Sequence, residues 1–230
     1  MTRKIALLFY GRISDRKEQY DNIMDRLLDY QNNDFVIDIF ISHPKDVDDD
    51  LLQKVVELYK PVIIIRNHEN YDVERIEKYS TTPNINKHNI MSSYLSRYNL
   101  FNAFYEYIEE NNNNYDIVIS SRMDIVMRSK FDINTLQHQI NNNILCIPNT
   151  EYDFGGINDH FAFGNVTSIA VYMKMFEKIY DILDISQSFK PEYMMYIYLQ
   201  KHNTYTIERC YIDYIWGSYH FQLLLDGKYP

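Results

Sequence analysis

Long hydrophobic runs and cysteines are both scarce in this chain of 230 residues. The apolar run Ile5–Tyr10 is too short for a signal-peptide core, and no later run approaches the roughly 20 apolar residues that a membrane span needs. The two cysteines, Cys146 and Cys210, could pair, but two thiols in a chain of this length are more typical of a reduced cytosolic protein. We therefore expect a cytoplasmic protein without a membrane span.

Positive charge and glycine are also in short supply. The 23 basic and 32 acidic side chains give a net charge of −9, and such a field repels a nucleic-acid backbone, so nucleic acid is not an expected partner. A phosphate-bearing ligand would need a cation or local arginines. There are six glycines, and no GxGxxG or GxxxxGK[ST] pattern follows the first apolar run, which disfavours a dinucleotide enzyme and a P-loop NTPase. The 22 tyrosines accompany other residues with AT-rich codons, and we interpret most of them as core and surface filler.

Apolar, β-branched runs alternate with amphipathic helical patterns in the first half of the chain. We expect strands at four runs, Lys4–Tyr10, Phe35–Ser42, Pro61–Arg66 and Asp116–Ile125. We expect helices at Lys17–Tyr30, Leu51–Leu58 and Asn89–Glu110. This alternation predicts an α/β fold with a mostly parallel central sheet and helices on both faces. Such sheets bind ligands at the carboxyl ends of their strands, where the strand order reverses.

The second half of the chain continues the same domain. Short strands are expected at Ile144–Ile147 and His160–Gly164, and helices at Val166–Leu183 and Pro191–Gln200. No internal repeat and no linker interrupts the sequence. A single domain over residues 1–230 is the economical interpretation.

The stretch Tyr115–Ile125 (YDIVISSRMDI) places charged residues at the end of a buried strand. A buried carboxylate such as Asp124 needs a cation, an arginine or solvent, because an unpaired buried charge is costly. A divalent ion that bridges Asp124 to a diphosphate would satisfy this need. A plain ion pair of Asp124 with Arg122 or Arg128 would satisfy it equally well, and this segment alone does not separate the two.

A second stretch, Gly155–Gly164 (GGINDHFAFG), joins two glycines to polar residues at the start of a short strand. Gly155 and Gly156 would let the backbone approach a ligand closely. Asp159 and His160 are then positioned for a general base or for binding sugar hydroxyls. A glycine-rich turn capped by Asn158 and Asp159 is an equally good interpretation of the same residues.

The first expected strand ends in Tyr10-Gly11-Arg12. A glycine at this place admits a nucleotide, and an arginine can bind its phosphates. The signal is weak by itself, because arginine is common after a first strand.

Together, these three motifs resemble the GT-A glycosyltransferases, most closely the small sugar transferases of bacterial polysaccharide clusters and large DNA viruses. Arg122-Met123-Asp124 matches the Arg-x-Asp form of their strand-end motif, and Asn158-Asp159-x-Phe-Ala-Phe-Gly matches their later block. The resemblance spans roughly Lys4 to His202 in the right order. It implies a Rossmann-like GT-A domain with a nucleotide-binding half of about 1–130 and an acceptor-side half of about 131–230.

The resemblance also implies a hexosyltransferase that moves a sugar from a nucleotide-sugar, with UDP-sugars favoured, to a glycan or a protein- or lipid-linked acceptor. Tyr10, Gly11, Arg12, Arg97 and Arg122 would line the donor, and Asp124 would hold Mn²⁺ or Mg²⁺. With Arg122 in place of a first aspartate, His220 is the expected second metal ligand, although a surface histidine in an aromatic tail is the commoner situation. Alternatively, Arg122 itself neutralises the diphosphate.

By the same resemblance, the sugar substrate would be bound by Gly155, Gly156, Asn158 and His160. Asp159 would deprotonate the acceptor if the reaction inverts the anomeric configuration, or orient the sugar if the reaction retains it. Two other functions stay open. A sugar nucleotidyltransferase shares the sheet and the metal, but Gly11-Arg12-Ile13-Ser14 is a poor version of its basic loop. A catalytically inactive sugar- or nucleotide-binding subunit is compatible with the loss of a metal ligand to Arg122. The sequence leaves the oligomeric state open.

Overall fold

A computed structural model describes residues 3–27, 35–68, 70–79, 86–128, 130, 142–149, 156–201, 206–210, 212 and 214–216. Gly155 and His220, both expected in the site, lie outside these ranges. Among the helices that the model describes, none is both long enough and apolar enough to cross a membrane.

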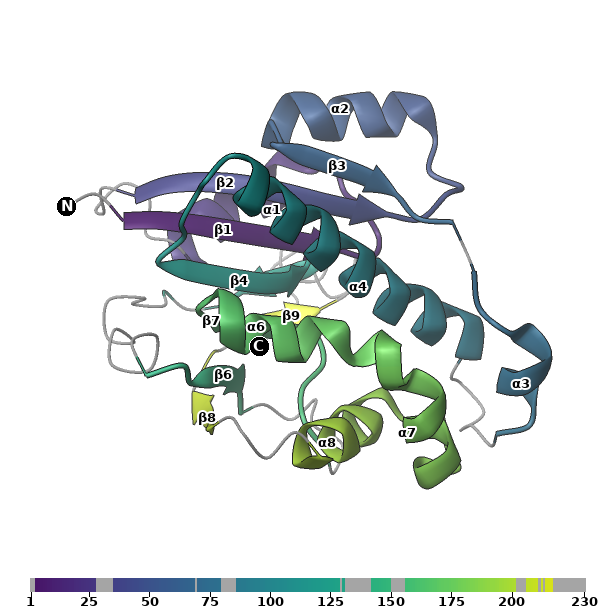
Figure 1. The fold of residues 1–230 in the computed structure, drawn as a ribbon. Coiled ribbons are helices and arrows are strands. Elements are labelled where there is room, and N and C mark those ends of the chain that lie inside the picture. The colour runs from purple at the N-terminus through teal and green to yellow at the C-terminus, as the bar shows by residue number, and fades with distance from the viewer. Residues whose placement is uncertain are drawn as a thin grey trace.

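A seven-stranded sheet forms the centre of the described structure (Figure 1). Its strands, in the order in which they lie side by side, are β3 (Ile63–Arg66), β2 (Phe35–His43), β1 (Arg3–Tyr10), β4 (Ile117–Arg122), β7 (Phe161–Gly164), β6 (Leu145–Pro148) and β8 (Ile207–Cys210). Pairing is parallel between β1, β2, β3 and β4 and between β6 and β8, and β7 runs antiparallel to both of its neighbours. The predicted α/β fold with a mostly parallel sheet is confirmed.

The strand order reverses between β1 and β4. The chain builds outward from β1 through β2 to β3, and then α4 (Lys87–Glu110) returns it to the other side of β1 as β4. Tyr10 is paired with Arg122 in the β1–β4 register, so the carboxyl ends of the two strands meet. This is the position at which open α/β sheets form a ligand-binding crevice.

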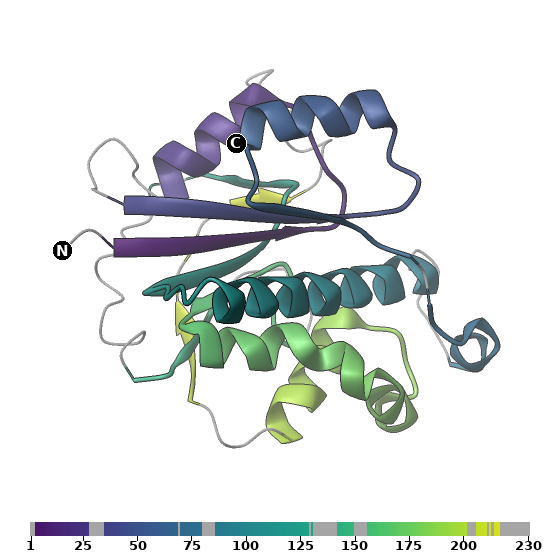
Figure 2. The ribbon, with the colours of Figure 1, turned by 45° about the horizontal axis from the view of Figure 1, so that its top comes forward.

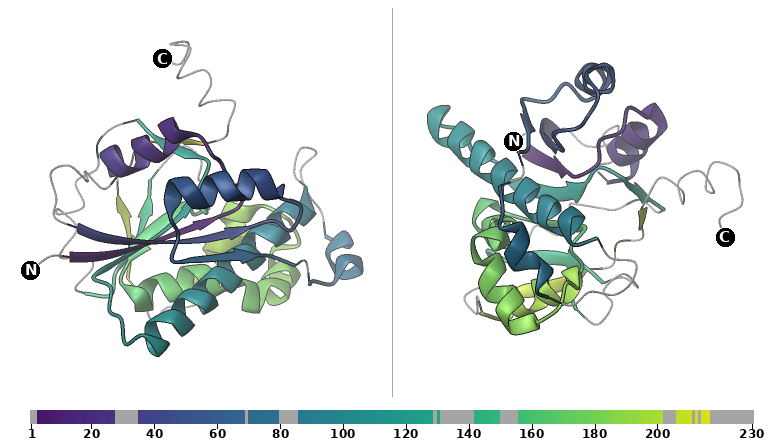
Figure 3. Two further views of the ribbon diagram at one scale, coloured as in Figure 1. Left: turned by 90° about the horizontal axis from the view of Figure 1, so that it is seen from above. Right: turned by 90° about the vertical axis from the view of Figure 1, so that its right-hand side faces the viewer.

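Helices cover both faces of the sheet, as predicted (Figure 2). One face carries α1 (Lys17–Asn22), which continues as a π-helical turn (Ile23–Leu27), and α2 (Asp49–Tyr59); Figure 3 shows these two helices together on one side. The other face carries α4, α6 (Val166–Met173), α7 (Ile179–Ser186) and α8 (Pro191–Lys201). A short helix, α3 (Val73–Glu77), precedes α4. Alternation along β1 feeds both layers, since Leu7 packs toward α1 and α2 while Leu8 packs toward α4.

Two expected elements are divided in the structure. The strand expected to run from Asp116 to Ile125 ends at Arg122, turns at Met123 and Asp124, and resumes as β5 (Ile125–Met127), which pairs with β9 (Tyr214–Trp216) in a separate sheet. The helix expected over Val166–Leu183 contains a 3₁₀ segment, Lys174–Lys178, between α6 and α7. A 3₁₀ segment has three residues per turn, so it rotates the buried face of the helix: Met175 and Ile179 are buried, and Phe176 and Tyr180 are only partly buried.

Candidate functional site

The site begins where β1 ends. Gly11 has φ of +89°, a conformation that favours glycine, and a Cβ placed there would meet no atom within 4 Å. Arg12 is exposed next to it. The backbone turns sharply here into open space, and a cationic side chain is available beside that space. The Tyr10 side chain does not face this space, because its ring is buried in the interior.

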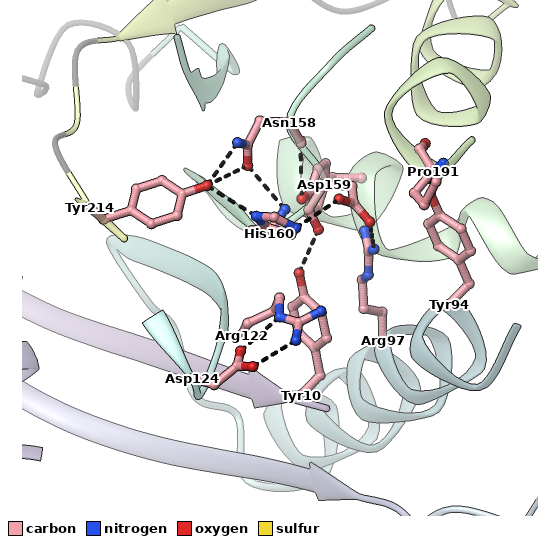
Figure 4. Close-up of polar contacts among 11 residues, drawn as sticks. Tyr10, Tyr94, Arg97, Arg122, Asp124, Asn158, Asp159, His160, Pro191 and Tyr214 are labelled. Carbon is pink, nitrogen blue, oxygen red and sulfur yellow. Dashed lines mark hydrogen bonds and ion pairs between the residues drawn. The ribbon is translucent and has the colours of Figure 1, made fainter. Parts of the chain in front are cut away.

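At the end of β4, the Arg122 guanidinium forms a two-pronged ion pair with Asp124. Nε and Nη2 of Arg122 each donate to one carboxylate oxygen at 2.7 Å (Figure 4). Burial alone would raise the pKa of Asp124, but the hydrogen bonds and charge of Arg122 outweigh it and hold that pKa below its usual value. The ion-pair interpretation of Asp124 therefore describes this structure, with the Met123–Asp124 turn bringing the two side chains together.

The start of β7 lies at the same edge of the sheet, because β7 runs antiparallel to β4. Ser121 is paired with Phe161, and the Arg122 amide donates to the His160 carbonyl at 2.9 Å. The segment Asn158–His160 therefore lies beside the Arg122–Asp124 pair, although some 35 residues separate them in the sequence. Its three side chains are buried.

Arg97 on α4 lies on the interior side of Asp159 and is 0% exposed. Its Nη2 donates to Oδ2 of Asp159 at 2.9 Å (Figure 4), while Nε and Nη1 have no hydrogen-bond partner. Three tyrosine rings, which we call the tyrosine cage, surround the guanidinium carbon at centroid distances of 4.8 Å, 4.4 Å and 5.4 Å: Tyr10, Tyr94 and Tyr172. Ring faces stabilise a cation in place of the missing hydrogen bonds.

This position corrects two sequence-based expectations. Arg97 supports Asp159 from inside the protein, and contact with a nucleotide would require the guanidinium to leave the tyrosine cage. Tyr10 belongs to that cage, and its hydroxyl donates to the Asp159 carbonyl at 2.7 Å. The two residues thus fix Asp159 through its side chain and its backbone.

The charges around Asp159 favour its ionised form. Burial raises its pKa, but His160, Arg97 and Arg122 more than compensate, and the net pKa lies below the usual value. Burial lowers the pKa of His160 to about 4 against the opposing effect of Asp159, so the ring is neutral at neutral pH. The two arginines therefore supply the positive charge near Asp159 under those conditions.

Asn158 and Tyr214 orient His160. The Asn158 side-chain oxygen accepts from the His160 amide at 3.0 Å, and its amide nitrogen donates to the Tyr214 hydroxyl at 2.7 Å. The same hydroxyl lies 3.5 Å from Nδ1 of His160 (Figure 4). Asn158 is 0% exposed and its side chain is engaged in these bonds, so its position is that of a support for His160.

Gly156 packs against the start of α8. A Cβ at Gly156 would lie 2.2 Å from the Glu192 carbonyl oxygen, and the neighbouring Ile157 amide donates to that oxygen at 2.9 Å. The glycine is thus required by contact with a helix, whereas the sequence suggested close approach to a ligand. This contact places Glu192 beside Asp159 and His160.

Asp159, His160 and Glu192 bring three metal-ligating side chains together. One ligand atom of each lies within 4.8 Å of the others. Asp124, the expected metal ligand, is not in this group and has both oxygens engaged by Arg122.

The structure brings together most of the residues expected from the sequence: Gly11, Arg12, Arg122, Asp124, Asn158, Asp159 and His160 lie at one edge of the sheet. Sequence analysis missed Glu192, Tyr94, Tyr172 and Tyr214. Pro191-Glu192 was recognised as a helix start, and the tyrosines were interpreted as filler. The sequence holds one signal for these four residues. Tyr94 lies three residues before Arg97 on the same helix, so the two side chains are neighbours, and Arg97 was already expected in the site.

Comparisons with known proteins find similar structures and no related sequence. No protein-family model and no curated protein matches the chain. Mouse xyloside xylosyltransferase 1 is similar over 91% of this chain and 85% of its own, with a TM-score of 0.46 and 10% identity. The Streptococcus pneumoniae glycosyltransferase GlyE (TM-score 0.44, 12% identity) covers 90% of this chain, which spans 45% of GlyE. A Desulfovibrio desulfuricans protein assigned as a nucleotide-diphospho-sugar transferase is similar over 91% of this chain and 80% of its own, with a TM-score of 0.44 and 12% identity. At these scores, the case for an activity depends on the side chains of the site.

Proposed function

We propose that the chain is a GT-A-type glycosyltransferase, one domain over residues 1–230, which moves a sugar from a nucleotide-sugar to a hydroxyl acceptor. The observation that carries the proposal is the pairing of Tyr10 with Arg122 at the β1–β4 reversal, with Gly11 and Arg12 leading into open space beside it. A nucleotide bound there lies over the sheet edge, as the switch-point rule requires.

Two arginines are suited to the diphosphate of the donor. Arg12 is exposed, and the Arg122 guanidinium lies at the end of β4, where its positive charge can act on phosphate oxygens while it stays paired with Asp124. The protein has a net charge of −9, so these local cations matter more than the overall field. We favour UDP-sugars as donors and a glycan or a protein- or lipid-linked hydroxyl as acceptor.

Asp124 fits poorly as the sole acidic ligand of Mn²⁺ or Mg²⁺. Both of its oxygens accept from Arg122 at 2.7 Å, and a metal ion would have to displace a cation that already neutralises the carboxylate. We therefore assign diphosphate neutralisation to Arg122 and derive no step from a metal ion at Asp124. His220 lies outside the described residues and stays a prediction.

Asp159 is our candidate for the catalytic carboxylate. Arg97 holds its Oδ2, and its Oδ1 lies 3.5 Å from Nε2 of His160, at the same edge as the proposed donor. Its low pKa keeps it ionised, so it can orient a sugar hydroxyl or stabilise developing positive charge. Its strength as a general base is correspondingly small, because a base works best with a pKa near the working pH.

The first test is stabilisation by donors. UDP-, GDP-, CMP- and dTDP-sugars are each added to the protein, with chelator or with Mn²⁺, and unfolding is followed. A UDP-sugar at about 100 times its Kd should raise the free energy of unfolding by about 2.7 kcal/mol. Arg122→Gln should lose this increase, and Arg66→Gln should keep it. Arg66 also ends a strand and pairs with an aspartate, Asp49, but β2 and β1 separate its strand, β3, from β4.

The result that would overturn the proposal is the absence of stabilisation by every nucleotide-sugar. Release of free nucleotide with an acceptor present then separates an enzyme from a binding subunit. Asp159→Asn should keep the donor stabilisation and lower nucleotide release by at least about 10²-fold. Stabilisation without any release by the unmodified protein would support the inactive binding subunit. The free thiols Cys146 and Cys210 agree with the cytoplasmic location that we propose.

A further inference from the structure

We infer that Asp159, His160 and Glu192 form a binding site for one divalent transition-metal ion. The three side chains are not the metal ligands that the sequence motif suggests. They come from two segments that are far apart in the chain, the start of β7 and the start of α8. Their ligand atoms converge within 4.8 Å of one another.

The distance between the first two ligand atoms has the value expected around a metal ion. Nε2 of His160 lies 3.5 Å from Oδ1 of Asp159, too far for a good hydrogen bond. Two ligands that are each about 2.1 Å from a tetrahedral ion lie about 3.4 Å from one another. The separation of this pair is thus already close to that of two ligands of one ion. The Glu192 oxygen lies within 4.8 Å of both atoms and would have to come closer by at most about 1.4 Å to be the third ligand.

Each ligand is held by a second group, as is typical of metal sites. Arg97 donates to Oδ2 of Asp159, which leaves Oδ1 directed at His160. The Tyr214 hydroxyl lies beside Nδ1 of His160, on the opposite side of the ring from Nε2. The Ile157 amide fixes the backbone of Glu192. These contacts orient the side chains of Asp159 and His160 and fix the backbone from which Glu192 extends before any ion binds.

The local charge also favours a cation. Asp159 and Glu192 bring two carboxylates together, and Arg97 is the arginine that bonds directly to Asp159. Arg122 is nearby, but its guanidinium already pairs with Asp124. Buried carboxylates are stabilised by pairing or by metal coordination. A divalent ion would bind the two carboxylates and the imidazole at one point.

The ligand types indicate which ion would bind. One imidazole and two carboxylates suit Zn²⁺ or Mn²⁺, whereas Mg²⁺ prefers six oxygen ligands and retains much of its water. We therefore expect Zn²⁺ and Mn²⁺ to bind more tightly than Mg²⁺. Metal binding itself does not depend on the proposed function. If both proposals hold, the ion would lie beside Arg122 and the donor diphosphate, and Asp159 would act on the substrate through the ion that it binds and not through a free carboxylate oxygen.

Calorimetric titration of the chelator-treated full chain with MnCl₂ or ZnCl₂, without any nucleotide, tests the site. We expect one ion per chain with an affinity at least tenfold higher than for MgCl₂. Glu192→Gln should weaken Mn²⁺ binding at least tenfold, and Tyr214→Phe should weaken it by about tenfold through its effect on His160. Glu57→Gln, an exposed glutamate on α2, should bind as the unmodified protein does.

His160→Gln provides a second loss-of-ligand variant if Glu192→Gln fails to give a normal melting transition in chelator. Binding of Mn²⁺ and Zn²⁺ with unchanged affinity to both variants would overturn the site, as would no binding by the unmodified protein. The failure of the glycosyltransferase proposal has a different signature. In that case no nucleotide-sugar stabilises the protein in chelator or in Mn²⁺, whatever the metal titration shows.

Discussion

At the residue scale, Arg97 is the most unusual side chain of the molecule. It is fully buried, has one ion-pair partner and is otherwise surrounded by the rings of the tyrosine cage. A buried ion pair contributes little net stability by itself, but the loss of one partner leaves an uncompensated charge in the interior. Arg97 and Asp159 should therefore behave as a unit.

A double-mutant cycle measures this unit. Arg97→Met should lower the free energy of unfolding by about 3–5 kcal/mol in urea titrations, because the Asp159 carboxylate stays buried without its cation. The same change should cost clearly less in an Asp159→Asn background. Arg66→Met, which breaks the exposed pair with Asp49, should cost about 1 kcal/mol or less. Equal costs of Arg97→Met in both backgrounds would show that the guanidinium acts by packing alone.

At the element scale, β1 to β4 and the first helices could be predicted from sequence because their patterns are local, whereas β8 and β9 were not predicted. The alternation Ile5, Leu7 against Ala6, Leu8 satisfies two helix layers, and Asp48 caps α2 by accepting from the Asp50 and Leu51 amides. The 3₁₀ break at Lys174–Lys178 could not be predicted. An uninterrupted helix would place residues 176 and 180 on its apolar face, and these are as apolar as residues 175 and 179, which are buried in the structure.

The site was predictable only where it follows strand ends. Arg122 and Asp124 lie at the carboxyl end of β4, so the sheet rule locates them. Asp159 precedes the start of β7 and reaches the same edge because that strand is antiparallel to β4. Glu192 enters through the close contact of two backbones at Gly156, and Tyr214 enters through the small β5–β9 sheet. Neither contact has a sequence pattern, because tertiary packing alone decides it.

The contact at Gly156 gives a prediction for α8. Gly156→Ala would place a Cβ 2.2 Å from the Glu192 oxygen and 2.6 Å from the Tyr193 nitrogen, and neither backbone atom can rotate away. The start of α8 has to shift, at a cost of about 1–3 kcal/mol. The NMR shift of the Tyr193 amide should change along with the unfolding midpoint. Gly11→Ala is the comparison: its cost comes from the positive φ, so the Tyr193 amide should stay unchanged. An unchanged Tyr193 amide in Gly156→Ala would contradict the contact.

At the scale of the whole molecule, two buried histidines make stability depend on pH: His160, whose pKa is lowered by burial, and His43, which acts in the same direction. His43 ends β2, is 1% exposed and lies with Nδ1 2.7 Å from the Pro44 carbonyl. Burial lowers its pKa against the effect of that hydrogen bond, and Arg66 on the neighbouring strand lowers it further. Since the unfolded chain binds a proton near pH 6.5 more readily than the folded one, its contribution is full above that pH and declines as the pH falls.

Urea unfolding at pH 7.5 and 5.5, in chelator, should therefore show lower stability at the lower pH. His43→Gln should reduce this difference, and His68→Gln, which changes an exposed histidine, should leave it as it is. If both variants kept the full difference, the acid sensitivity would have to come from other groups.

The interior position of β1 in the sheet has a consequence for synthesis. β1 is made before both of the strands that pair with it, and its partner β4 follows about 112 residues later, as the bond between Lys4 and Asp116 shows. At about 5–20 residues per second, one edge of β1 waits on the order of 10 s for its partner. An apolar strand with an open edge can pair with another nascent chain during that time. The yield of folded protein should thus depend on translation speed and on chaperones that cover the N-terminal segment.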